Sequence, residues 1–209
     1  MISISGPLFN KFNDKSEVAI DLNSITSRLD AKDSELWGKA AAPEAKVRLN
    51  WVDLPVASRE LLPQLDALSA WARSNNLDNF VLCGMGGSSL APEVIAKTYG
   101  KKLTVLDTTD PGQIKLAIPE NLSQTLIIVG SKSGSTIETA SQKKFFEKLF
   151  TDAGLNPVDH FVIVTDPGSP LDLSARSSGL RVINADPRVG GRFSALSAFG
   201  LVPAALLGV

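Results

Sequence analysis

The stretch TLIIVGSKSGST, residues 125–136, decides the fold. Its first half is an apolar run of strand length, and its second half is a loop rich in hydroxyl side chains. A helix-like segment follows from Ile137 to Phe150. We therefore predict a buried strand that leads through a polar loop into a helix. A helix N-terminus carries unpaired N–H groups and the positive end of the helix dipole, so this loop suits an anion, especially a phosphate.

The same order of strand, turn and helix recurs from about residue 79 onward. Such apolar strands are buried on both faces, which predicts an α/β fold: a doubly wound five-stranded parallel sheet flanked by helices. Ligands of these sheets bind beyond the carboxyl ends of the strands, at the switch point of the strand order. The candidate strands are residues 80–83, 103–106, 126–129, 161–164 and 180–183, and a last helix is expected from about Ala195.

Three helix starts carry capping patterns. Asp110 and Ser169 each precede a proline, which is favoured at the first helical position. Ser135 precedes Glu138 by three residues, as in a capping box. We expect each of these side chains to cap its helix.

The first part of the chain has a helical pattern of apolar residues rather than an alternation of strands and helices. Residues 1–78 are predicted to form an N-terminal helical appendage that packs on the main domain, residues 79–209. Its helices show apolar stripes at helical spacing, such as Leu61, Leu65, Leu68 and Ala72. Trp37 and Trp51 lie between these helices, and we expect core packing rather than a ligand role for both.

Composition narrows the class of protein. The net charge of −1 over 209 residues gives no basic surface for nucleic acid or an anionic membrane, so neither partner is expected. Cys83 is the single cysteine, which precludes an intrachain disulfide and fits a reducing compartment. Met1 to Phe12 lacks the features of a signal peptide, and no apolar run reaches membrane-spanning length. We expect a cytoplasmic protein.

A glycine-rich turn, GMGGSS, follows the first strand at residues 84–89. A dinucleotide fingerprint needs its third glycine where Ser89 stands, so the turn does not fit that motif. Gly86 and Gly87 instead allow the backbone to approach a small polar ligand, with Ser88 as a donor. The alternative is a tight turn in which Ser88 or Ser89 caps the next helix.

Two further loops meet at the same predicted edge. The 131–136 loop is not a Walker A loop, and its hydroxyls suit a phosphate monoester, although a solvated helix start is the plainer alternative. GGRFS at residues 190–194 places Arg192 behind two glycines, where a guanidinium can stabilise an oxyanion. The alternative for Arg192 is a surface ion pair with Asp186.

Other reactive side chains receive structural interpretations. His160, the only histidine, is expected to be a structural or surface residue, Glu138 a capping residue and Cys83 a small core residue. We predict no metal site and no cofactor.

Three motifs in order resemble the glucose-6-phosphate isomerase family, in particular bacterial forms that include fusions with transaldolase. They are CGMGGSSLAPEV (83–94), VGSKSGSTIET (129–139) and DPRVGGRFSALSAFGLVPAAL (186–206), and LDTTDP (106–111) fits the same family. The resemblance covers about residue 34 to the end, and three ordered motifs are far more specific than one.

The resemblance implies a sugar-isomerase (SIS) domain, the first of two, in a homodimeric enzyme. It implies interconversion of glucose 6-phosphate and fructose 6-phosphate through a cis-enediol, without a cofactor, and a small-molecule sugar phosphate as the partner. Arg192 matches the arginine that stabilises the intermediate, and Gly87 and Ser88 would contact the sugar. The phosphate would be held by Ser131, Lys132 (through its backbone), Ser133 and Thr136.

The family's glutamate, histidine and late lysine have no match in this chain and are expected beyond Val209. We therefore expect these 209 residues to bind sugar phosphate weakly and not to isomerise it. Two rival interpretations remain: a non-catalytic SIS-type sugar-phosphate sensor and a nucleotide-binding Rossmann protein.

Overall fold

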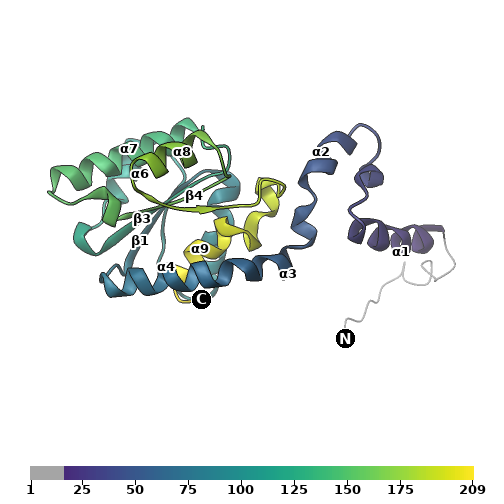
Figure 1. Cartoon of the computed structure of the whole chain (residues 1–209), viewed down its shortest axis with the longest axis horizontal. Helices are drawn as coiled ribbons and strands as arrows, with labels where there is room; N and C mark the ends of the chain where they lie inside the picture. The colour runs from purple at the N-terminus through teal and green to yellow at the C-terminus, as the bar shows by residue number, and fades with distance from the viewer. Residues whose placement is uncertain (1–16) are drawn as a thin grey trace.

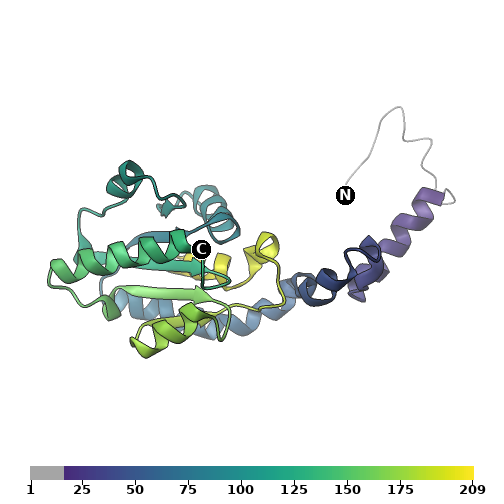
Figure 2. The same cartoon turned by 90° about the horizontal axis from the view of Figure 1, so that it is seen from above.

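A computed structural model describes residues 17–209, with side chains from Ser24 onward. The stretch from Met1 to Phe12, which bears on a signal peptide, lies outside the described residues. Within them, a parallel sheet forms the centre of a rounded body, and the first helices extend from it as an arm (Figures 1 and 2).

Five parallel strands form the sheet in the order β2-β1-β3-β4-β5. This confirms the predicted fold class. The order reverses between β1 and β3, so the switch point, where such sheets bind ligands, lies between these two strands. The strands are β1 (Asn79–Gly84), β2 (Thr104–Leu106), β3 (Thr125–Ser131), β4 (Phe161–Thr165) and β5 (Arg181–Asn184).

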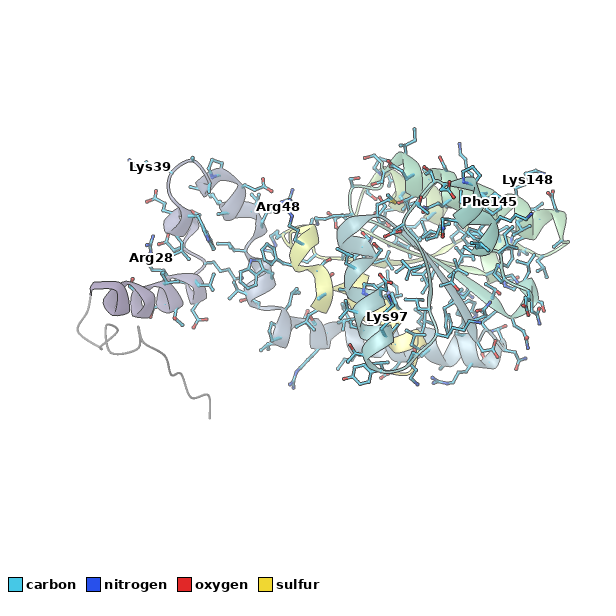
Figure 3. The ribbon with its side chains drawn as sticks, turned by 180° about the vertical axis from the view of Figure 1, so that it is seen from behind. Arg28, Lys39, Arg48, Lys97, Phe145 and Lys148 are labelled. Carbon is cyan, nitrogen blue, oxygen red and sulfur yellow. The ribbon has the colours of Figure 1, made fainter. Side chains whose placement is uncertain are left out.

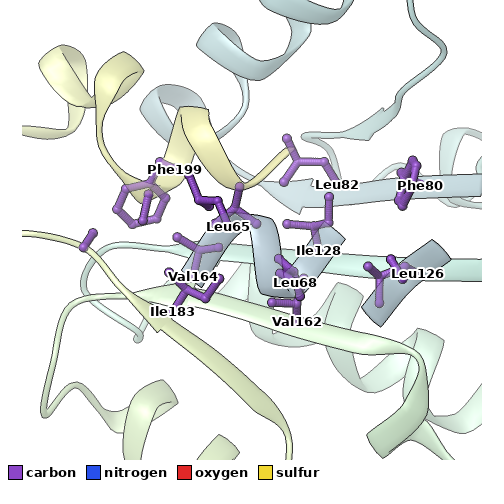
Figure 4. Packing of buried hydrophobic residues seen from close by; sticks show 14 of the residues in the cluster. Leu65, Leu68, Phe80, Leu82, Leu126, Ile128, Val162, Val164, Ile183 and Phe199 are labelled. Carbon is purple, nitrogen blue, oxygen red and sulfur yellow. The ribbon is translucent and has the colours of Figure 1, made fainter. Parts of the chain in front are cut away.

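Alternate residues of each strand point to opposite faces of the sheet, and both faces are covered. On one face, Leu82 and Ile128 pack with α4 (Leu62–Ser74) and α9 (Ala198–Leu206), as Figure 4 shows. On the other, Val81 and Ile127 pack with α6 (Pro111–Leu116), α7 (Ile137–Asp152) and α8 (Pro170–Ser177). α5 (Leu90–Thr98) packs against α9. The result is three layers with an apolar core on each side of the sheet.

Two of the three predicted helix-capping residues, Asp110 and Ser169, cap their helices. Asp110 accepts a hydrogen bond from the N–H of Gln113, and Ser169 accepts one from Asp172. The capping box at Ser135 is wrong: α7 begins one residue later, with Thr136 as its N-cap and no side-chain capping bond. The last helix also begins later than expected, at Ala198, because a 3₁₀ segment (Gly191–Leu196) precedes it.

The N-terminal arm, residues 17–53, runs out from the end of α4. It contains α1 (Glu17–Asp30), α2 (Ala42–Arg48) and short 3₁₀ turns, and α3 (Leu54–Ala57) joins it to the body. Among the described residues, the arm makes hydrogen bonds and a ring stack with residues 186–193 of the body. Leu49 bridges Val189, and Trp51 stacks on Phe193 with ring centroids 4.9 Å apart.

Candidate functional site

A cavity of about 330 Å³ lies at the carboxyl ends of β1, β3 and β4. It is therefore at the switch point of the sheet, where the topology favours a ligand. Six of the seven sequence-predicted site residues line it. They are Gly87, Ser88, Ser131, Lys132, Ser133 and Thr136.

The start of α7 supplies hydrogen-bond donors to this cavity. The Ser131 hydroxyl donates to Oγ1 of Thr136 over 3.2 Å, while Ser133 is exposed. Because no side chain caps α7, its first N–H groups have no intrahelical or capping partner. The loop thus combines free backbone donors, three hydroxyls and the positive end of a 16-residue helix.

Gly134 fixes the shape of this loop. Its φ is +66°, a conformation that side chains disfavour. A Cβ at this position would lie 2.6 Å from the Ser169 hydroxyl oxygen, so the loop packs directly on the start of α8. On the inner side, the Thr165 hydroxyl donates to the Ser131 carbonyl over 2.6 Å. The loop is held from two sides, which leaves its donors preorganised.

Two glycine turns meet on the other side of the cavity. The backbone of Gly87 approaches Gly191 so closely that a Cβ on Gly87 would lie 2.3 Å from the Gly191 carbonyl oxygen. The Ser194 hydroxyl joins the two turns, because its single proton is shared between the carbonyl oxygens of Gly87 (3.1 Å) and Gly191 (2.6 Å). Ser88 is buried beneath them and lines the cavity. The expected capping role of Ser88 or Ser89 is wrong: α5 has no side-chain cap, and the Ser89 hydroxyl donates to Gly86 instead.

The ammonium of Lys132 forms an ion pair with the carboxylate of Asp166. Its Nζ lies 2.7 and 3.0 Å from the two carboxylate oxygens of Asp166, and the two side chains are only 21% and 18% exposed. Nζ also donates to the carbonyl of Pro187 over 3.2 Å. Lys132 therefore ties the β3 loop to the loops after β4 and β5. This leaves its backbone as the part that can face a ligand.

A second cavity, of about 610 Å³, adjoins the first and shares Arg48, Gly87, Lys132 and Gly191 with it. Arg192 lines this larger cavity and not the smaller one. The Arg192 side chain is exposed and makes no ion pair or hydrogen bond within residues 24–209, so the alternative of a pair with Asp186 is wrong. Asp186 pairs instead with Arg188 and Asn50.

Asp186 anchors the loop that carries Arg192. Burial acts to raise the pKa of this carboxyl, but hydrogen bonds from the Asn50 side chain and the Arg188 N–H outweigh it, and the pKa lies below its usual value. The carboxylate is therefore charged at neutral pH. It binds the arm and the 186–193 loop together beside the larger cavity.

The two tryptophans of the arm are not core residues. Trp37 is 51% exposed, and Trp51 is half-buried in its stack on Phe193. Both line the larger cavity, together with the arm residues Ala41, Glu44, Ala45, Arg48 and Leu49. The packing expectation is wrong for Trp37, whose side chain is half exposed, whereas Trp51 packs the arm onto the main domain through its stack on Phe193.

The structural roles expected for His160 and Cys83 are confirmed, and the capping role expected for Glu138 is wrong. His160 is buried rather than at the surface; its Nδ1 lies 2.9 Å from the Thr125 carbonyl, and its ring lies against Phe150. Cys83 is fully buried, and burial raises the pKa of its thiol. Glu138 is half-buried but caps nothing.

Sequence reasoning missed three charged residues of the cavities, Asp166, Arg48 and Glu44. Asp166 follows a predicted strand directly, so the rule that placed the other loops could also have found it. Arg48 lies on the arm, and nothing in the sequence connects that segment with the sheet edge.

Within residues 17–209, every helix is too short or too polar to cross a membrane. In the same part of the chain, no three histidine, cysteine, aspartate or glutamate side chains gather closely enough to hold a metal ion.

Known proteins show the same combination of sequence and fold. The family model described as phosphoglucose isomerase matches residues 62–209. The glucose-6-phosphate isomerase of Cyanothece sp. is 40% identical over 146 residues, which cover 66% of this chain and 28% of that protein. The chain thus spans less than a third of that relative's length.

Solved structures share the fold of this chain over most of its length. A hypothetical protein from Thermus thermophilus has a TM-score of 0.74 and 34% identity, over 90% of this chain and 44% of that one. A glucose-6-phosphate isomerase from Chlamydia trachomatis has a TM-score of 0.66 and 31% identity, over 78% of this chain and 31% of that one.

Proposed function

This chain belongs to the phosphoglucose isomerase family, and from that premise we propose that its smaller cavity binds the phosphate group of glucose 6-phosphate or fructose 6-phosphate. The observation that carries the proposal is the uncapped N-terminus of α7, with Ser131 and Thr136 beside it, at the floor of a cavity on the switch point. Backbone N–H groups and hydroxyls are the donors that a phosphate monoester requires.

The adjoining cavity suits the sugar end of the same ligand. It shares Gly87 and Gly191 with the smaller cavity, so a hexose attached to the bound phosphate would extend toward Arg192. In the complete enzyme, the substrate would isomerise through a cis-enediol, and the Arg192 guanidinium would stabilise the negative charge that develops on oxygen.

Proton transfer between two carbons needs a positioned general base. Neither cavity supplies one with a free carboxylate: Asp166 is paired with Lys132, and Glu44 with Arg48. We therefore propose that this piece supplies phosphate binding and does not isomerise the substrate alone. Turnover by the purified 209-residue chain would contradict that part of the proposal.

The phosphate site is tested by titrating fructose 6-phosphate into the chain. Thr136→Val removes one hydroxyl from the cavity, and the loss of a hydrogen bond to a charged group should weaken binding by about tenfold to a hundredfold. Thr151→Val is the matched control, because Thr151 lies on the same helix, is exposed and donates only to the Glu147 carbonyl. Equal binding by both variants would refute a phosphate at α7.

The same proposal includes a cytoplasmic location and homodimerisation of the complete protein, as the family resemblance implies. Sedimentation of the full-length protein is the direct measurement of its assembly. A monomer that retains isomerase activity would remove the dimer from the proposal and leave the phosphate site intact.

A further inference from the structure

We infer that Arg48 of the N-terminal arm is a further phosphate-binding residue, which supplies the positive charge that selects a sugar phosphate over the free sugar. This inference rests on the proposed function. It concerns a residue outside the sheet edge and outside the three ordered motifs.

The position of Arg48 is the first observation. It is the last residue of α2, on the side of the arm that faces the body (Figure 3), and it lines both cavities. It is the sole contribution of the arm to the smaller cavity within the described residues. An arginine thus reaches the proposed phosphate site from a segment more than 80 residues away from Ser131 in sequence.

The charge balance is the second observation. The smaller cavity contains two cationic side chains, Arg48 and Lys132, and one carboxylate, Asp166. Because Lys132 and Asp166 pair with each other and are largely buried, their charges cancel at the site. Arg48 is the remaining cation, and its ion pair is with an exposed carboxylate, Glu44, rather than a buried one, so its charge is the one that a ligand can use. A guanidinium beside these hydroxyls and N–H groups would add a charge-assisted contact to a phosphate dianion and offset part of its desolvation.

The hydrogen bonds of Arg48 leave part of its guanidinium available. Nε donates to Glu44 over 2.8 Å, and Nη1 donates to the Pro187 carbonyl over 2.7 Å. Nη2 makes no hydrogen bond within residues 24–209. Glu44 is 74% exposed, and such a surface ion pair contributes little, so a phosphate can displace it. The planar guanidinium can then bind two phosphate oxygens.

The backbone around Arg48 is already in place for this role. The next residue, Leu49, bridges Val189, and Asn50 donates to Asp186 through its side chain. These bonds fix the end of α2 against the 186–193 loop. Binding therefore requires a movement of one side chain rather than the ordering of a segment, which keeps the entropic cost low.

The test is calorimetric titration of the 209-residue chain with fructose 6-phosphate, and with fructose as the uncharged probe. We expect R48Q to weaken fructose 6-phosphate binding by about tenfold to a hundredfold, since it removes a hydrogen bond between charged groups. We expect E44Q to tighten binding by up to about fivefold, because it frees Arg48 from a surface pair. The matched control is R188Q, because Arg188 lies on the same loop contact, is 69% exposed and lines neither cavity.

The opposite signs of R48Q and E44Q distinguish a phosphate contact from a packing role. If both variants weaken binding, Arg48 acts by holding the arm, and the inference is overturned. Unchanged binding by R48Q also overturns it but leaves the proposed function standing. If the unmodified chain binds fructose 6-phosphate no better than fructose, the proposed function fails as well.

Discussion

Replacing Gly87 with alanine should separate the two glycine turns that form the wall between the cavities. The added Cβ would lie 2.3 Å from the oxygen and 2.7 Å from the carbonyl carbon of Gly191. Both are backbone atoms, so no rotamer change can relieve the contact. The hydrogen bond from Ser194 to the Gly87 carbonyl would be strained at the same time.

The size of the effect follows from these two contributions. Overpacking of a close contact typically costs about 1–3 kcal/mol, and a lost hydrogen bond about 0.5–1.5 kcal/mol. The expected loss is therefore about 1.5–4.5 kcal/mol of unfolding free energy, which lowers the Tm of a chain of this size by about 3–18 °C.

Thermal unfolding followed by circular dichroism measures the change. Gly191→Ala is the matched control, since a Cβ there meets nothing within 4 Å, and its Tm should shift by no more than about 2 °C. A Gly87→Ala variant that unfolds at the temperature of the unmodified chain would refute the close approach of the two turns.

Three further outcomes are expected. Phe146→Ala removes a fully buried ring from between α7 and the sheet and should cost about 3–5 kcal/mol in urea unfolding; a loss below about 1 kcal/mol would contradict that packing. The pKa of Asp172 is lowered, first by the hydrogen bond from the Gly168 N–H, so its contribution to stability is present above the unfolded pKa near 3.8 and is lost as the pH falls through the lower folded value. Asp172→Asn should therefore flatten the fall of Tm with acid, and an unchanged slope would count against the hydrogen bond. Cys83 should resist a thiol reagent in the native chain and react once urea unfolds it, because burial raises the pKa of the thiol; rapid native labelling would show that β1 is open.

The sheet and its ligand edge were predictable because local patterns decide them. Each strand is an apolar run with a polar turn at its end, and parallel strands bring their carboxyl ends to one edge. That rule alone is enough to bring Gly87, Ser131 and Thr136 together. The family resemblance then supplied roles for these positions.

The errors arose where distant contacts decide the outcome. Thr136 rather than Ser135 is the N-cap of α7, because the loop is shaped by Gly134 packing on α8, and nothing local to the Ser135–Glu138 pattern reveals that contact. Trp37 was expected in a core, yet it borders a cavity, because the arm packs on a loop rather than on the sheet. Arg48 was missed for the same reason.

The partners of the N-terminal segments lie far along the chain, and this affects how the protein is made. The Ser69 hydroxyl donates to the carbonyl of Ala205, and Arg48 donates to Pro187; the paired residues are 136 and 139 positions apart. At about 5–20 residues synthesised per second, the apolar stripe of α4 waits roughly 7–27 s on the ribosome before β5 and α9 can cover it. During that interval the stripe lacks its α9 partners, Phe199 and Val202. The nascent chain is therefore a candidate for chaperone protection, and a translational pause anywhere between α4 and α9 would lengthen the interval, whereas a pause before α4 would not.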